Sequence, residues 1–200
     1  MRRADLGARL ERLPAVLTAP EFLAGSGIGN EIGFHIFAYD AKDEPVVSSY
    51  LPKLLQTLTG PAHGLRVLVL DLYRMSLDLL DARGVLDKAF ELERAKGTAE
   101  MEKAVRRIVR PENLVALVRE RIEGAEPDLI FMVGVGAAYP LVRSHTILNN
   151  LHAVVDRVPL VMFFPGSYDG QELRLFDTLK DDNYYRAFPL LDTVNEGDRL

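Results

Sequence analysis

Hydrophobic positions along the chain alternate between helical spacing and short unbroken apolar runs. A first amphipathic helix is predicted over residues 4–18, because its leucines recur at intervals of three and four. Pro20 suits the first turn of a short helical piece that ends near residue 24. Apolar positions from Val46 to Leu58 predict a further helix, in which Pro52 produces a kink or marks a later start.

Several short segments are apolar enough to form buried strands. They comprise residues 34–39 (FHIFAY), 66–72 (RVLVLDL), 129–135 (LIFMVGV) and 160–164 (LVMFF), with residues 184–190 as a candidate fifth strand. Strands that are apolar on both faces and alternate with helices predict a mainly parallel sheet that is covered on both sides. The expected fold is therefore α/β, a three-layer arrangement in which residues 1–200 form a single domain.

Long helical stretches separate the predicted strands. Residues 75–123 are expected to hold three helices, with breaks at Gly84, Gly97 and Pro111, and the last helix is expected over residues 113–123. A shorter helix is predicted over residues 141–151. These stretches supply the two helical layers of the expected fold.

Composition narrows the class of protein. The chain is 48% hydrophobic and 26% charged, which is typical of a globular protein. Its net charge of −5 argues against a generally basic, nucleic-acid-binding surface. Arg106, Arg107 and Arg110 are close together, but glutamates precede them, so this segment is interpreted as a solvated helix face. Direct binding to nucleic acid is not expected.

Some chemistries are excluded by residue type and spacing. The chain has no cysteine, which rules out disulfides, thiolate catalysis and cysteine-ligated zinc. It has no H-x-x-x-H pair and no G-x-S-x-G turn, so neither a metal site nor a hydrolase nucleophile is expected. No apolar run reaches the roughly 18 residues of a membrane span. We expect a cytoplasmic protein without a cofactor.

Two glycine-rich turns are candidate binding segments. Residues 25–33 (GSGIGNEIG) precede a strand rather than follow one, so a tight connection is favoured over a phosphate-binding turn. Asn30 and Glu31 stay candidates because they flank the entry to the sheet. Residues 134–140 (GVGAAYP) do follow a strand, which is the right place for a nucleotide-binding turn, although their spacing matches no dinucleotide motif.

Two polar clusters complete the set of candidates. On the helix predicted over residues 141–151, His145 and Asn149 share a face and Arg143 is nearby. The block 165–188 is rich in tyrosine and arginine, the residue types enriched at interface centres. Its candidates for contact with a partner or ligand are Tyr168, Asp169, Arg174, Asp181, Asn183, Tyr184, Tyr185 and Arg186. The alternative is an ordinary loop whose tyrosine hydroxyls satisfy buried backbone groups.

Three motifs give the chain a family resemblance. GxGNEIxFxIFxYD (residues 27–40), GVGxxYPxxRSHTxLNNL (134–151) and FxPGxYDGxxLRLFxxLxDxNYYRAFxL (163–190) resemble the BrxB family of bacterial BREX phage-defence systems. Asp177 stands where the family pattern favours glycine. The resemblance implies a core component of the defence system that acts beside an alkaline-phosphatase-like PglZ protein, an adenine-specific DNA methyltransferase and a large ATPase.

The resemblance implies a function without catalytic residues that can be transferred. The expected role is a non-catalytic assembly subunit that binds the PglZ component. The alternative is a nucleotide-binding or nucleotide-hydrolysing enzyme of the same system. A weaker similarity, to the central sheet of RecA/AAA-like NTPases, supports at most a degenerate relative, because the Walker A lysine loop is missing and Gly134 and Val135 replace the Walker B acids.

Overall fold

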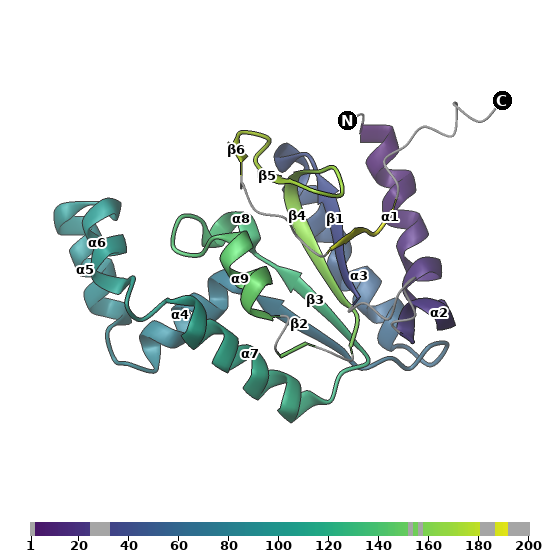
Figure 1. Cartoon of the computed structure of the whole chain (residues 1–200), viewed down its shortest axis with the longest axis horizontal. Coiled ribbons are helices and arrows are strands. Elements are labelled where there is room, and N and C mark those ends of the chain that lie inside the picture. Colours follow the sequence, from purple (N-terminus) through teal and green to yellow (C-terminus); the bar gives the residue numbers. More distant parts are fainter. Residues whose placement is uncertain (1–2, 25–32, 152–153, 156–157, 181–186, 192–200) are drawn as a thin grey trace.

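A parallel sheet forms the centre of the computed structural model, which describes residues 3–24, 33–151, 154–155, 158–180 and 187–191 (Figure 1). The main sheet has the order β2-β3-β4-β1-β7, and its neighbouring strands are parallel. These strands are β1 (Phe34–Tyr39), β2 (Val67–Asp71), β3 (Leu129–Val133), β4 (Leu160–Tyr168) and β7 (Phe188–Pro189). The predicted α/β class with a mainly parallel sheet is confirmed.

Helices cover both faces of the sheet. One face packs against α1 (Arg3–Leu17) and α3 (Glu44–Thr59), and α2 (Pro20–Leu23) follows α1. The other face packs against α4 (Leu72–Asp81), α7 (Pro111–Ala125), α8 (Val135–Ala138) and α9 (Ser144–Leu151). The remaining pair, α5 (Leu86–Lys96) and α6 (Thr98–Val105), projects from the sheet as an arm (Figure 1). The layers therefore follow the predicted sandwich of helix, sheet and helix.

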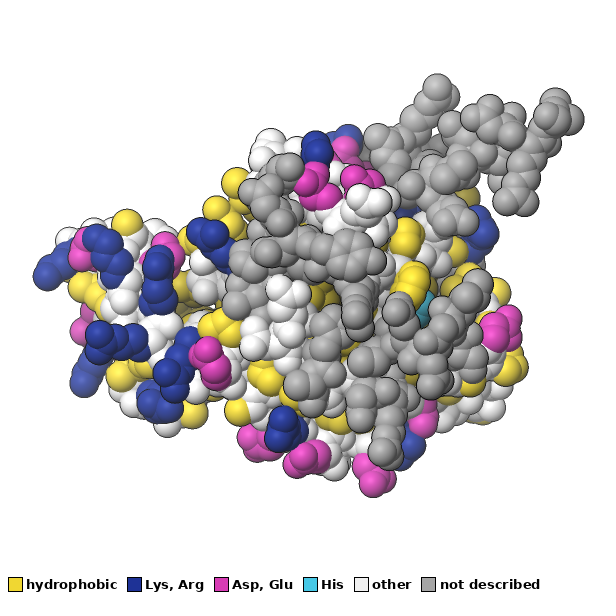
Figure 2. Space-filling model, viewed as in Figure 1, with side chains coloured by type: hydrophobic (Ala, Val, Ile, Leu, Met, Phe, Trp, Pro, Cys, Tyr) yellow, Lys and Arg dark blue, Asp and Glu magenta, His cyan; other side chains and the backbone are white. Residues whose placement is uncertain are grey.

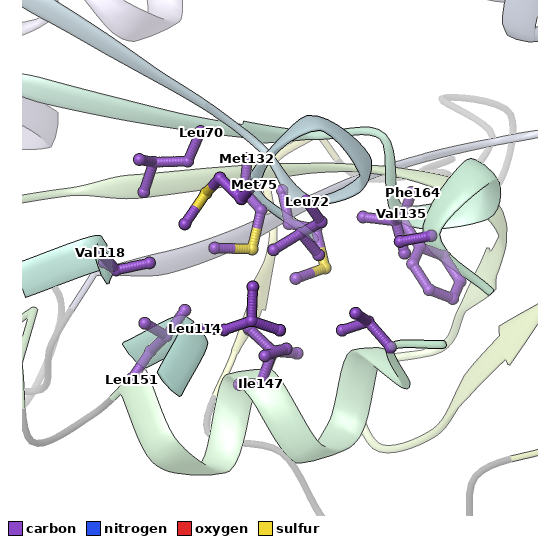
Figure 3. Packing of buried hydrophobic residues seen from close by; sticks show 14 of the residues in the cluster. Leu70, Leu72, Met75, Leu114, Val118, Met132, Val135, Ile147, Leu151 and Phe164 are labelled. Carbon is purple, nitrogen blue, oxygen red and sulfur yellow. The ribbon is translucent and has the colours of Figure 1, made fainter. Parts of the chain in front are cut away.

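Alternation along the central strands creates two separate hydrophobic cores. In β3, Phe131 points towards α1 and α3, whereas Met132 points towards α7 and α9. Phe131 packs edge-on against Phe163 with ring centroids 5.2 Å apart. On the opposite face, Figure 3 shows Leu114 and Ile147 filling the space between helices and the sheet. Burial on both faces explains why these strands read as unbroken apolar runs.

Several element boundaries differ from the predictions. Residues 72–125 hold four helices rather than three, because each of the breaks at Gly84, Gly97 and Pro111 separates two of them. The third strand ends at Val133, since Gly134 takes a φ of 70° and leaves extended backbone. The last helix begins at Ser144 and not at residue 141. Pro52 neither breaks nor delays α3, because its ring lies on the solvent side of the helix.

The largest correction concerns residues 165–180, which the sequence analysis treated as a loop. β4 continues to Tyr168, and its second half pairs antiparallel with β5 (Leu173–Leu175). β5 in turn pairs with β6 (Leu179–Lys180). We call residues 169–180 the β5–β6 hairpin. Of the predicted fifth strand, β7 confirms residues 188 and 189, and residues 184–186 lie outside the described part of the chain.

Candidate functional site

The β5–β6 hairpin lies beyond the carboxyl end of β4, at the edge where parallel α/β sheets usually carry their sites. Its turn is held by backbone hydrogen bonds: Phe176 N–H donates to Pro165 O at 2.9 Å, and Asp177 N–H donates to Arg174 O at 3.1 Å. Phe176 and Asp177 have φ angles of 55° and 60°, in the left-handed region. This conformation explains why the family pattern favours glycine at position 177.

The hairpin packs on the turn that follows β3. The rings of Phe176 and Tyr139 are nearly perpendicular, with centroids 6.3 Å apart. A Cβ added to Gly136 would lie 3.0 Å from Pro165 and 3.1 Å from Phe176. A Cβ added to Gly134 would lie only 2.3 Å from the Asp71 carboxylate. The glycines of residues 134–140 therefore admit neighbouring protein groups, and little space is left beside them for a nucleotide.

Tyr168 and Asp169 organise the hairpin from inside. The buried Tyr168 hydroxyl donates to Ala187 O at 2.6 Å, which ties β4 to the segment entering β7. The Asp169 carboxylate accepts the backbone N–H groups of Gln171 at 2.9 Å and Glu172 at 2.7 Å. These bonds hold the pKa of Asp169 below its usual value. Both candidates thus have structural work in the turn.

The outer side of the hairpin is open to solvent. Arg174 is exposed and pairs with Glu172, with 2.6 Å between nitrogen and oxygen. Phe176 and Leu179 are each 36% exposed, which is high for large apolar side chains. The sequence analysis missed both. The signal was present, since Leu173 and Leu175 are buried on either side of exposed Arg174, the period-two pattern of a strand.

The remaining candidates divide into two groups. Arg143 and Asn149 are exposed at the start and in the last turns of α9, and α9 packs against α7. For His145 the structure describes only the helical backbone. The other candidates lie outside the described residues: Asn30, Glu31, Asp181, Asn183, Tyr184, Tyr185 and Arg186.

An acidic turn follows β1 and leads into α3. Residues 40–44 contain Asp40, Asp43 and Glu44 against a single lysine, Lys42, which pairs with Asp40. Tyr39 donates a hydrogen bond from its hydroxyl to Glu44. Burial, and then this bond to a carboxylate, raise the pKa of Tyr39 above its ordinary value. Carboxylates suit the positive end of a helix, but they repel an anionic ligand there.

Two further searches cover the described residues alone. In that part of the chain, no three histidine, aspartate or glutamate side chains gather as ligands for a metal ion. None of its helices combines the length and apolarity that a membrane crossing demands.

Comparison with known proteins agrees with the motifs. The model of the family described as "BREX protein BrxB" matches residues 68–190. A BREX protein BrxB of Bacillus cereus is 44% identical over 194 residues, which cover 96% of this chain and all of that protein. A BREX protein BrxB of Escherichia coli is 32% identical over 183 residues, covering 92% of this chain and 90% of the relative. No solved structure matches significantly.

Proposed function

Since the chain belongs to the BrxB family of BREX systems, which implies a role in phage defence, we propose that it is a non-catalytic assembly subunit. Its partner is the alkaline-phosphatase-like PglZ component, and its docking element is the β5–β6 hairpin. The observation that carries this proposal is the exposed pair Phe176 and Leu179 on a firmly anchored hairpin. Large apolar side chains rimmed by charge are typical of interface centres.

The anchoring of the hairpin supports docking energetically. A partner that binds a mobile loop must offset the entropy lost when the loop becomes ordered. Here the Tyr168 hydroxyl, the Asp169 carboxylate and the Phe176–Tyr139 ring contact already hold the backbone. Arg174 and Glu172 lie next to the apolar pair and supply a charged rim. The hairpin therefore presents its side chains in a fixed arrangement.

The alternative, a nucleotide-binding or nucleotide-hydrolysing enzyme, receives less support. Asp71, Pro165 and Phe176 occupy the space beside the glycines of residues 134–140. The acidic turn at residues 40–44 follows β1, the strand whose loop would cradle phosphates in a P-loop protein. Both features disfavour a triphosphate at the carboxyl edge of the sheet. The degenerate RecA/AAA-like relationship stays a hypothesis.

Charge reversal on the hairpin tests the assembly role. We expect the double variant Arg174→Glu/Leu179→Glu to abolish co-purification with the PglZ component from cells that express both proteins. Both side chains are exposed, so the thermal unfolding midpoint should change little. The measurement is the amount of PglZ protein retained by tagged chain, together with thermal unfolding of each variant.

Phe90→Glu on α5 is the matched control, because Phe90 is 40% exposed but lies on the projecting arm. This variant should retain PglZ at the level of the parent chain. The docking proposal is wrong if the folded hairpin variant still retains PglZ, or if both variants lose it equally. Hydrolysis of ATP by the purified chain would favour the alternative function.

A further inference from the structure

A hollow of about 230 Å³ lies at the base of the projecting arm. Three segments that are distant in sequence surround it: the end of α6 with the following turn, the start of α7, and the turn that precedes α9. The hollow is separate from the β5–β6 hairpin, and none of the hairpin's residues lines it.

The charged lining of the hollow is mostly positive. Arg106, Arg110 and Arg143 line it against a single acidic residue, Glu102. This local charge is opposite to the net charge of −5 of the whole chain. Arg106 and Arg110 are separated from Arg143 by more than 30 residues of sequence, so only the packing of α7 against α9 brings the three together.

The arginines are only partly neutralised. Arg106 pairs with Glu102 at 2.7 Å, but its side chain is still 70% exposed. Arg110 lies 3.6 Å from Glu112, too far for a good hydrogen bond, and both side chains are well exposed. Arg143 forms no ion pair with a carboxylate of the described residues. Such guanidinium groups are available to a multiply charged anion.

The backbone beneath the arginines is fixed by the core. Val109, Leu114 and Val142 line the floor, and each is at most 5% exposed. Pro111 occupies the first turn of α7, and no side chain caps this helix end. The positive end of a 15-residue helix therefore adds to the charge of the arginines. Figure 2 shows further lysine and arginine side chains gathered over α5 and α6 on the same face.

We propose that this hollow binds the phosphate group of a phosphate ester. Planar guanidinium groups match the oxygens of phosphate in pairs, which a carboxylate partner exploits less fully. The volume is smaller than the roughly 300–1,000 Å³ of complete small-molecule sites, so the hollow takes a phosphate and part of its sugar. The ester is either a free nucleotide or the backbone of a nucleic-acid strand, which share this group.

Amide chemical shifts of the ¹⁵N-labelled full chain test the proposal at low salt. The probes are inorganic phosphate, adenosine monophosphate and a short single-stranded oligonucleotide. We expect saturable shifts at residues 106–114 and 140–143. Arg110→Gln/Arg143→Gln should weaken binding by at least about tenfold, since two charge-assisted hydrogen-bonding groups are lost.

The control is Arg83→Gln/Arg119→Gln, which removes the same charge from exposed positions outside the hollow. Its affinity for each probe should match the parent chain within about twofold. The proposal is overturned if no probe shifts the amides around the hollow, or if both double variants weaken binding equally. Much tighter binding of the oligonucleotide identifies a nucleic-acid strand, and comparable binding of adenosine monophosphate identifies a free nucleotide.

This inference is independent of the assembly role. Loss of PglZ binding in the hairpin variant and loss of phosphate binding in the arginine variant are measured separately. Either result can fail while the other holds.

Discussion

Single residues of the C-terminal motif show that part of this family signature is structural. A Cβ on Gly166 would lie 2.1 Å from the carbonyl oxygen of Arg174, so only glycine lets β5 approach β4 there. Tyr168 and Asp169 each satisfy backbone groups of the hairpin or its neighbour. Substituting any of the three would disturb the hairpin itself. Binding experiments should therefore change the exposed residues of the hairpin.

Asp177 gives the first residue-level prediction. Because its φ of 60° is strained for a residue with a Cβ, Asp177→Gly should leave stability unchanged or raise it by up to about 1 kcal/mol. Asp177→Val, with a β-branched side chain in the same conformation, should destabilise the chain by at least about 1 kcal/mol. Urea unfolding of both variants measures the difference. A glycine variant clearly less stable than the parent would contradict this account of the turn.

Among the elements, the arm of α5 and α6 is the least supported. Ala89 is the single buried residue of α5, and Val105 is the single buried residue of α6. By contrast, four of the five residues of β3 are buried. The arm therefore depends on contacts between its own two helices, and it contributes one wall of the arginine-lined hollow.

Native-state hydrogen exchange tests this difference between elements. Amides of α5 and α6 should exchange through local opening well before those of β3 and β4, whose exchange should follow global unfolding. Mass spectrometry of peptides from the two regions gives the comparison. Equal protection in both regions would show that the arm is held by contacts other than those described.

For the whole molecule, His35 connects the protonation of one group to global stability. It lies in β1, between the ring of Phe22 at 4.8 Å and that of Phe188 at 6.1 Å between centroids. Burial lowers the pKa of His35 from 6.5 to about 4. The unfolded chain therefore binds a proton at a higher pH than the folded chain does.

The free energy of unfolding should accordingly fall as the pH drops from 6.5 to about 4. His35 alone accounts for about 3 kcal/mol over this interval. Asp128 and Asp169 have lowered pKa values, so the stability that they contribute is lost at still lower pH. Urea unfolding between pH 4 and 7 should show a slope that His35→Leu removes. The same slope in that variant would mean that His35 does not titrate as its burial implies.

Much of the fold was predictable because it depends on local patterns. β1 was predicted with its observed ends, and the breaks between α4, α5, α6 and α7 follow glycine and proline. The hairpin was missed because β4 changes, within one strand, from a buried parallel partner to an antiparallel one. The candidate site was predicted only in part. Tyr168, Asp169 and Arg174 meet there, whereas Phe176 and Leu179 were not recognised.

The sequence by itself determined the fold class, the approximate extent of most helices and strands and, through its motifs, the family. These follow from hydrophobic periodicity and turn chemistry, which act over a few residues. Only the tertiary structure decided the strand order, the filling of the turn at residues 134–140 and the meeting of Arg106, Arg110 and Arg143. These features arise from packing between distant segments, and local patterns do not encode which segments become neighbours.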